Sequence, residues 1–242
     1  MKKRLENIQK RIREAALRCG RNPEEIRLVA VSKTVPAERI LEAVEAGVKV
    51  FGENYIQEAQ KKIGDLSGYL LSWHFIGHLQ TNKARYAVNL FDLIHSVDSL
   101  KLARELDIQA KKINKIQDIL IQVNIGEEIS KSGTAVEELH SLVKDISRLE
   151  SLSVKGLMII PPFYDEPEKV RPYFSKLREL RDQIRAEKIP NIAMDELSMG
   201  MTGDFEAAVE EGATMVRIGT AIFGKRDLHT EIINNFKNTS TA

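Results

Sequence analysis

The sequence places a lysine where its amine could act as a nucleophile. Lys33 follows the apolar residues 28–31 and comes shortly before Pro36, where an amphipathic stretch begins. This pattern predicts a buried parallel strand over residues 28–33, with a helix after it. Burial disfavours the charged ammonium, and a neutral lysine amine forms Schiff bases with carbonyl compounds. In the alternative interpretation, the aliphatic part of the Lys33 side chain extends out of the barrel so that its ammonium group lies in water and has no chemical role.

Two glycine-bearing stretches, residues 197–204 and 217–220, could bind an anion. They follow the last two predicted strands, where barrel enzymes commonly bind phosphate. Glycine lets backbone N–H groups approach an anion closely, and nearby hydroxyl groups add donors. The residues of these two kinds are Gly200, Gly203, Gly219, Ser198, Thr202 and Thr220. In the alternative interpretation these are ordinary turn glycines, and Thr202 caps the next helix.

A Schiff-base lysine and a phosphate-binding rim together predict a ligand with an aldehyde and a phosphate. Pyridoxal 5′-phosphate (PLP) carries both groups, and its ring nitrogen also needs a partner. Arg217, at the end of the last predicted strand, is the candidate for that partner. Arginine cannot accept a proton, so it would leave the ring nitrogen unprotonated and the ring a weaker electron sink. The alternative for Arg217 is a salt bridge at the rim.

The elements that must position these residues alternate between strand and helix. The predicted strands are 28–33, 48–52, 72–77, 93–97, 119–124, 152–158, 196–198 and 215–218. The helices are expected at 3–18, 36–47, 54–63, 83–89, 98–112, 134–148, 168–187 and 204–211. Such alternation makes parallel strands with helices outside, and eight units in 242 residues match the size of a TIM (β/α)8 barrel. We therefore predict an α/β barrel with an extra N-terminal helix. A doubly wound open sheet is the rival, but it normally has a glycine-rich loop after strand one, and residues 32–36 contain no glycine.

Composition narrows the function classes. The 36 basic and 35 acidic residues nearly cancel, which argues against a nucleic-acid or membrane surface. Cys19 is the one cysteine, so no disulfide can form within the chain and a reducing compartment is expected. The charged N-terminus does not resemble a signal peptide, and no apolar run is long enough to span a membrane. We expect a cytoplasmic protein with one domain over residues 1–230 and a C-terminal tail over 231–242.

Two other patterns predict nothing functional. His74 and His78 have the four-residue spacing of a metal pair on a helix. Gly77 and the neighbouring β-forming residues indicate a strand and a turn instead, and no third ligand is evident, so no metal is expected. The basic residues Lys111, Lys112 and Lys115 are interpreted as solvated faces rather than as an RNA-binding surface.

Six segments carry a resemblance to a known family over about residues 5 to 230. They are AVSKT (30–34), GENYIQE (52–58), WHFIGHLQTNK (73–83), GLM (156–158), LSMGM (197–201) and VRIGTAIFG (216–224). They resemble segments of the YggS/PROSC family, the PLP homeostasis proteins, whose barrel is similar to the N-terminal barrel of alanine racemase. Ile56 and Thr202 are conservative departures from the pattern of that family.

The resemblance implies a set of ligand contacts. Lys33 would carry PLP as a covalent aldimine, and Arg217 would face the pyridine nitrogen. The phosphate would be held by Ser198, Gly219 and Thr220. Met199, Gly200 and Asn54 would lie near the ligand.

Three functions remain open at this point. The resemblance implies a PLP carrier and buffer without an established reaction, which acts in amino- and keto-acid balance and has apo-forms of PLP enzymes as partners. A PLP-dependent amino-acid racemase is the alternative, but it needs a second acid or base, which in alanine racemases comes from a separate C-terminal domain that we do not expect here. Tyr55 and Tyr164 are internal substitutes for that group. A class I aldolase without PLP is the third function. We expect a PLP-binding protein, not an enzyme, that is a monomer or a weak dimer.

Overall fold

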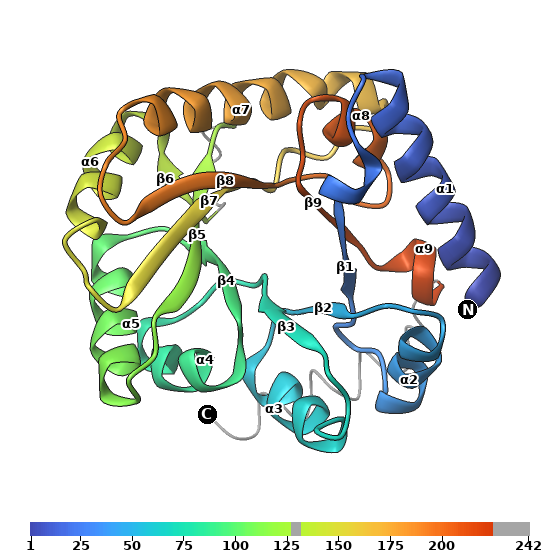
Figure 1. The fold of residues 1–242 in the computed structure, drawn as a ribbon, viewed down its shortest axis with the longest axis horizontal. Helices are drawn as coiled ribbons and strands as arrows, with labels where there is room; N and C mark the ends of the chain where they lie inside the picture. The colour runs from blue at the N-terminus through green and yellow to red at the C-terminus, as the bar shows by residue number, and fades with distance from the viewer. Residues whose placement is uncertain (127–131, 225–242) are drawn as a thin grey trace.

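The computed structural model describes residues 1–126 and 132–224, and they form a closed parallel barrel surrounded by helices (Figure 1). The barrel strands are β1 (Arg27–Val31), β2 (Val50–Glu53), β3 (Ser72–Phe75), β4 (Leu93–Val97), β5 (Gln117–Asn124), β7 (Leu152–Met158), β8 (Ile192–Ser198) and β9 (Met215–Ile218). Each strand pairs in parallel with the next, and β9 pairs back with β1. The predicted TIM barrel is confirmed.

The helices lie on the outside of the barrel (Figure 1). They are α1 (Lys2–Arg18), α2 (Ala37–Glu45), α3 (Ile56–Asp65), α4 (Ala84–Leu90), α5 (Leu100–Lys112), α6 (Val136–Ile146), α7 (Arg171–Ala186), α8 (Phe205–Glu210) and α9 (Thr220–Phe223). Single 3-10 turns cover Pro23–Glu25, Thr81–Lys83 and Pro167–Lys169. No helix within the described ranges combines the length and the apolar character that a membrane crossing requires.

The extra N-terminal helix is also confirmed. In α1, Leu5, Ile8, Ile12 and Ala15 recur at three- and four-residue spacings and are buried. This apolar stripe packs against α8 and α9, so α1 covers the outside of the last barrel units (Figure 1).

Several boundaries differ from the predictions by a few residues, and three of the differences change the type of an element or the residues at a strand end. The strand predicted to end at Lys33 ends at Val31, so Lys33 lies in a turn. The strand predicted at 196–198 begins earlier, at Ile192. Its start was not predicted because Met194 has a positive φ of 55° and the pairing with β7 shifts register nearby, so the residues do not alternate as in a regular strand. The start of the helix predicted at 134–148 is the short strand β6 (Thr134–Ala135), which pairs with β5.

Side chains of the barrel strands face two environments. Val29, Leu93, Leu120, Met158 and Met215 form an apolar cluster that contains no helix residue, so it lies inside the barrel. The larger cluster joins the other face of the strands to the helices. Because successive strand residues point to opposite sides, this difference tells which polar side chains face inward.

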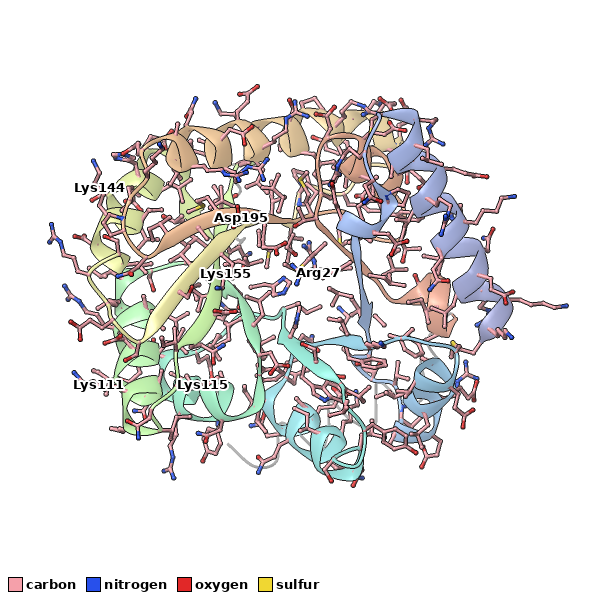
Figure 2. All side chains as sticks on the ribbon, in the orientation of Figure 1. Arg27, Lys111, Lys115, Lys144, Lys155 and Asp195 are labelled. Carbon is pink, nitrogen blue, oxygen red and sulfur yellow. The ribbon has the colours of Figure 1, made fainter. Side chains whose placement is uncertain are left out.

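Charged side chains of the helices lie at the periphery. Figure 2 shows Lys111 on α5 and Lys144 on α6, away from the barrel axis. Lys115 differs, because its Nζ donates to Val88 O and Phe91 O, at 2.7 and 2.8 Å, and so caps the end of α4. Burial lowers the pKa of Lys115. Its role is structural.

Candidate cofactor site

The carboxyl ends of β1 and β9 bring Lys33 beside a glycine turn. The two strands pair from Arg27 with Met215 to Ala30 with Ile218. A Cβ atom at Gly219 would lie 3.3 Å from Val31 O, a tight contact, so glycine lets the two turns approach closely. One small pocket is lined by Val31, Lys33, Val35, Gly219, Thr220, Phe223 and Gly224. The structure therefore brings together three of the residues expected at the ligand: Lys33, Gly219 and Thr220.

The second glycine-bearing stretch lies next to the first. Thr220 Oγ1 and Thr202 Oγ1 are 3.3 Å apart, and Arg217 N donates to Gly200 O at 3.0 Å. Gly200 has a φ of +90°, and a Cβ atom there would lie 2.5 Å from Ala208 Cβ, so only glycine fits. The two hydroxyl groups thus converge at one rim. Thr202 was not among the contacts implied by the family resemblance, although its hydroxyl and position were visible in the sequence.

Asn54 has an unsatisfied polar atom at the same end of the barrel. It follows β2, and its Oδ1 is buried without a hydrogen-bond partner among the described residues. Gly77 packs directly on its backbone, since a Cβ atom there would lie 2.4 Å from Asn54 O. A buried acceptor without a protein donor fits a donor group on a bound ligand.

Arg217 is held by neutral acceptors. Its side chain is almost fully buried, with Nη1 donating to Ser198 Oγ at 2.6 Å and Nη2 donating to Ile159 O at 2.7 Å. Burial lowers the pKa of Arg217 to about 10, and the nearby carboxylate of Asp204 acts in the opposite direction. The group therefore stays charged at neutral pH. No ion pair to Arg217 is found within residues 1–126 and 132–224, so the rim salt bridge considered from the sequence does not form there.

Behind Arg217 runs a line of buried hydrogen bonds that we call the histidine chain: Ser198, His95 and His74. Ser198 Oγ lies 2.9 Å from His95 Nδ1, and His95 Nε2 lies 3.0 Å from His74 Nδ1. Burial lowers the pKa of His74 to about 4 and the pKa of His95 well below 6.5, so both rings are neutral at pH 7.

One end of the histidine chain has a fixed direction: the guanidinium can only donate, so Ser198 Oγ accepts from Arg217. The donor and acceptor roles of the His95 and His74 ring nitrogens depend on their tautomers. In the tautomer with His95 protonated at Nε2, Ser198 donates to His95 Nδ1 and His95 donates to His74 Nδ1. The Ser198 hydroxyl is fully buried and used by these two bonds. Its expected contact with phosphate stays a prediction, and that contact would compete with both bonds.

Met199 and His74 have surroundings that differ from those considered from the sequence. Met199 is fully buried in the cluster that joins strands and helices, so its side chain packs in the core and only its backbone is left for a ligand. His74 contacts His95, at 3.0 Å, rather than His78. No group of three potential metal ligands occurs in the parts of the chain that the structure describes.

Sequence reasoning missed three charged residues next to the Lys33 turn: Glu53, Glu58 and Lys62, which we call the Lys62 cluster. Glu58 and Lys62 are four residues apart on α3, a spacing that indicates an ion pair on a helix. The burial of Lys62, which is 6% exposed, had no signal in the sequence, because lysines on helices normally lie in water.

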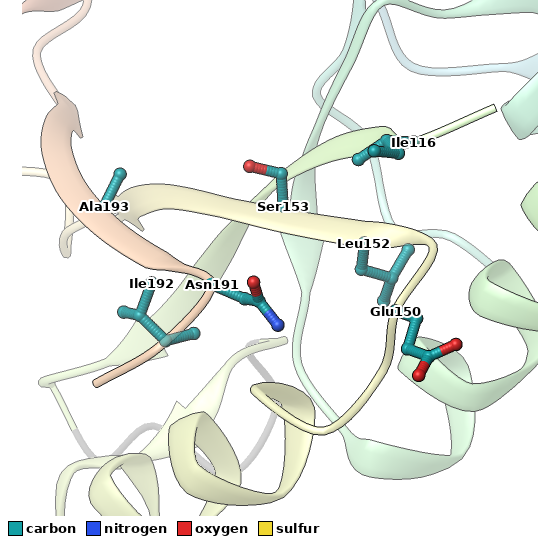
Figure 3. A pocket seen from close by; sticks show the side chains of 7 residues that line it. All are labelled: Ile116, Glu150, Leu152, Ser153, Asn191, Ile192 and Ala193. Atoms are coloured by element: carbon teal, nitrogen blue, oxygen red, sulfur yellow. The ribbon is translucent and has the colours of Figure 1, made fainter.

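A larger cavity lies at the other end of the barrel. Its volume is about 380 Å³, and its lining includes Leu152 and Ile192, the first residues of β7 and β8 (Figure 3). None of the expected ligand residues lines it. In TIM barrels the chemistry occurs at the carboxyl ends of the strands, so this cavity at the amino ends is not the candidate site.

Comparisons with known proteins establish the fold and the family. The family model described as alanine racemase, N-terminal domain, matches residues 4–227. A protein of Aquifex aeolicus (strain VF5) named Pyridoxal phosphate homeostasis protein is 50% identical over 223 residues, which cover 92% of this chain and 97% of the relative. The structure of PipY of Synechococcus elongatus PCC7942 with PLP bound is similar, with a TM-score of 0.79, 38% identity and coverage of 90% of this chain and 100% of PipY. Alanine racemase of Corynebacterium glutamicum shares the fold, with a TM-score of 0.67, 16% identity and coverage of 92% of this chain and 62% of the racemase.

The barrel is of the kind that forms the N-terminal domain of alanine racemases. The identity and coverage of the relatives are high enough to assign the family. The chain belongs to the family of pyridoxal phosphate homeostasis proteins, as the six segments of the sequence predicted.

Proposed function

We propose that this protein holds PLP as a Schiff base on Lys33 and acts as a carrier and buffer of PLP. The observation that carries the proposal is a pocket lined by Lys33, Gly219 and Thr220, with the buried guanidinium of Arg217 on β9, the strand that leads into the glycine turn. The name of the relatives and the PLP-bound structure of PipY support the same ligand.

The residues present fit the groups of PLP. Lys33 would supply the amine that holds the aldehyde carbon as a Schiff base, with a C=N bond in place of the C=O bond and the oxygen released as water. Thr202, Thr220 and the backbone of Gly219 supply donors for the phosphate. The unsatisfied Oδ1 of Asn54 would accept a hydrogen bond from a donor group of the ligand.

Arg217 would weaken PLP as an electron sink, and other observations favour a carrier over an enzyme. PLP supplies an electron sink when its ring nitrogen is protonated, and a guanidinium can donate to that nitrogen but cannot protonate it under these conditions. The relatives are named as homeostasis proteins, and the alanine racemase is similar at only 16% identity. The hydroxyl of Tyr164, one of the two substitutes considered for a racemase acid, lies 3.1 Å from the hydroxyl of Tyr173. We therefore propose that the protein is not an enzyme.

The remaining expectations complete the proposal. Apo-forms of PLP enzymes would receive the cofactor, and amino- and keto-acid balance would change when the protein is lost. The cytoplasmic location, the monomer or weak dimer and the single domain over 1–230 stay predictions. The predicted tail, residues 231–242, lies outside the described residues.

Reductive trapping tests the proposal. Purified protein mixed with PLP should gain the near-visible absorbance of a Schiff base, and borohydride should attach the phosphopyridoxyl group to the peptide that contains Lys33. Lys33→Ala should lose this label, whereas Lys111→Ala, on the outer face of α5, should keep it. Equal labelling and equal affinity in Lys33→Ala would overturn the assignment.

A transfer assay tests the carrier role. The loaded protein is mixed with an apo-form of a PLP enzyme, and the activation is compared with that by the same amount of free PLP. We expect the apo-enzyme to be activated at a rate that depends on the concentration of the loaded protein. We expect no measurable racemisation of amino acids. Turnover of an amino acid to its enantiomer would favour the racemase instead.

A further inference from the structure

We propose that Lys62 is a positioning residue for Lys33. Together with Glu53 and Glu58, it locks the turn at residues 32–34, so that Lys33 is presented to the pocket in one backbone conformation. This inference rests on the proposed function, because it takes Lys33 to be the residue that holds PLP.

Lys62 uses its whole hydrogen-bonding capacity at this turn. Its Nζ donates to Ser32 O at 2.6 Å, to Glu53 Oε1 at 2.8 Å and to Glu58 Oε1 at 2.6 Å. An ammonium has three protons, and these three acceptors match them. Lys62 is therefore a fully engaged cation, and its role at this site is to hold other groups.

The same cluster binds both chain neighbours of Lys33. On one side, Ser32 Oγ donates to Glu53 Oε1 at 2.6 Å, in addition to the bond between Ser32 O and Lys62. On the other side, Thr34 N donates to Glu58 Oε1 at 2.6 Å. Because the residues before and after Lys33 are both tied to the cluster, the direction in which its side chain leaves the backbone is set.

Thr34 shows that this turn needs support. Its φ is 62°, in the left-handed region that β-branched residues rarely adopt. Such conformations persist where surrounding contacts determine them, and they concentrate at functional sites. The bond from Thr34 N to Glu58 is such a contact, and Val35 N closes the turn by donating to Ser32 O at 2.9 Å.

The Lys62 cluster lies behind the pocket. Glu53 is on the same side of β2 as Phe51, which packs in the cluster that joins strands and helices, so Glu53 points toward α3. None of Glu53, Glu58 and Lys62 lines the pocket that contains Lys33. The cluster can therefore support the turn without contacting the ligand.

The charges make this support specific. Glu53 is fully buried, and burial raises its pKa, while the Lys62 ammonium and the hydrogen bonds from Lys62 and Ser32 act in the opposite direction. Burying charged groups is costly, and well-packed apolar residues would join α3 to the barrel wall at least as well. The polar groups do what apolar residues cannot, which is to bind the backbone on both sides of Lys33.

A comparison of two ligands separates positioning from a general structural role. PLP needs the Lys33 amine, whereas pyridoxine 5′-phosphate has the same ring and phosphate but an alcohol in place of the aldehyde. In Lys62→Met we expect the affinity for PLP to fall about ten- to a hundredfold, since small misplacements of a reacting group have effects of that size. The affinity for pyridoxine 5′-phosphate should stay unchanged, and the Schiff-base absorbance should weaken or shift. The matched control is Lys61→Met, the exposed neighbour on α3.

Two further variants keep the test informative if Lys62→Met does not fold. Glu58→Gln retains the shape of a partly exposed side chain but removes its charge, and it should weaken PLP binding selectively. Lys62→Met combined with Glu53→Gln removes the carboxylate that would be left alone, so it should fold yet still bind PLP weakly.

Each outcome decides one question. Wild-type protein that forms no Schiff base on Lys33 would overturn the proposed function, and the inference with it. Wild-type labelling with unchanged PLP affinity and absorbance in these variants would overturn the inference alone. Equal loss of both ligands would show that Lys62 only supports the fold, which would also overturn the inference.

Discussion

The turn after β1 and the end of β9 hold their basic residues, Lys33 and Arg217, with different chemistry. The Lys62 cluster holds the Lys33 turn with charged groups, between the barrel wall and α3. The histidine chain holds Arg217 with neutral groups, inside the barrel. Lys33 is fixed through its backbone neighbours, whereas Arg217 is fixed through its own guanidinium.

This difference corresponds to the group that each residue would present to a ligand: a charged guanidinium for Arg217 and a positioned amine for Lys33. A carboxylate bound to Arg217 would offset its charge, whereas Ser198 Oγ and Ile159 O orient the guanidinium without neutralising it, so that it can donate to the ring nitrogen of the ligand. For Lys33 the position of the amine matters more than the sign of the surrounding charges. A charged cluster can therefore hold the Lys33 turn, because it lies behind the pocket and does not contact the ligand.

The largest effect is expected from breaking the charged support. Lys62→Met leaves Glu53 buried without its cation, and removing one partner of a buried ion pair costs about 3–5 kcal/mol of stability. Denaturant unfolding monitored by circular dichroism measures the change. Adding Glu53→Gln should recover part of the loss. A loss as small as that of the exposed control Lys61→Met would mean that the charged support is not needed for folding.

Replacing Ser198 should disrupt the neutral groups that hold Arg217. Ser198→Ala leaves Arg217 Nη1 and His95 Nδ1 without a shared partner, and hydrogen bonds to charged groups contribute about 1.5–3 kcal/mol. PLP affinity and unfolding free energy should both decrease, because the guanidinium is no longer held. Ser147→Ala, at a partly exposed site just after α6, is the control. Unchanged affinity would contradict the role of Ser198 in orienting Arg217.

The two supports should also differ in their pH dependence. Burial lowers the folded-state pKa of His74 to about 4, below the usual 6.5, so the unfolded state takes up the proton first as pH falls. The stability associated with neutral His74 is complete above pH 6.5 and is lost as pH falls from 6.5 toward 4. Between pH 6.5 and 5 this amounts to about 2 kcal/mol, at about 1.4 kcal/mol per pH unit.

Unfolding curves measured across that pH range check this dependence. His74→Phe should make the decline of stability between pH 6.5 and 5 less steep, and the remaining decline comes from the buried His95, whose pKa is also lowered. His140→Gln, at an exposed ion pair with Glu187, should retain the full decline. Equal pH profiles for wild type and His74→Phe would show that the buried ring is not the source.

The smallest loss of PLP affinity is expected at the hydroxyl groups of Thr202 and Thr220, at the rim of the pocket. Thr220→Val removes one hydroxyl donor, which should weaken binding of PLP by about 1 kcal/mol. The loss should be absent for pyridoxal, which lacks the phosphate. Isothermal titration with both ligands measures it, and equal losses for the two would remove Thr220 from the phosphate site.

Some elements were predictable because their signals are local. The apolar runs of β4, β7 and β9 matched the predicted bounds, and the periodic stripe of α1 predicted its buried face. The start of β8 was missed, since Met194 has a positive φ and the strand does not alternate in a regular way there. Lys33, Gly219 and Thr220 could be placed together in advance, because parallel strands of a closed barrel end at the same face.

By itself, the sequence determined the barrel and the presence of an amine and glycine turns at one end of it. Apolar periodicity, turn residues and strand ends are properties of short stretches of chain, so they can be recognised without knowing the contacts. Only the tertiary structure decided which groups hold Lys33 and Arg217. A buried polar group must be satisfied by whatever partner folding brings within reach, and His95 reaches Ser198 across 103 positions of sequence.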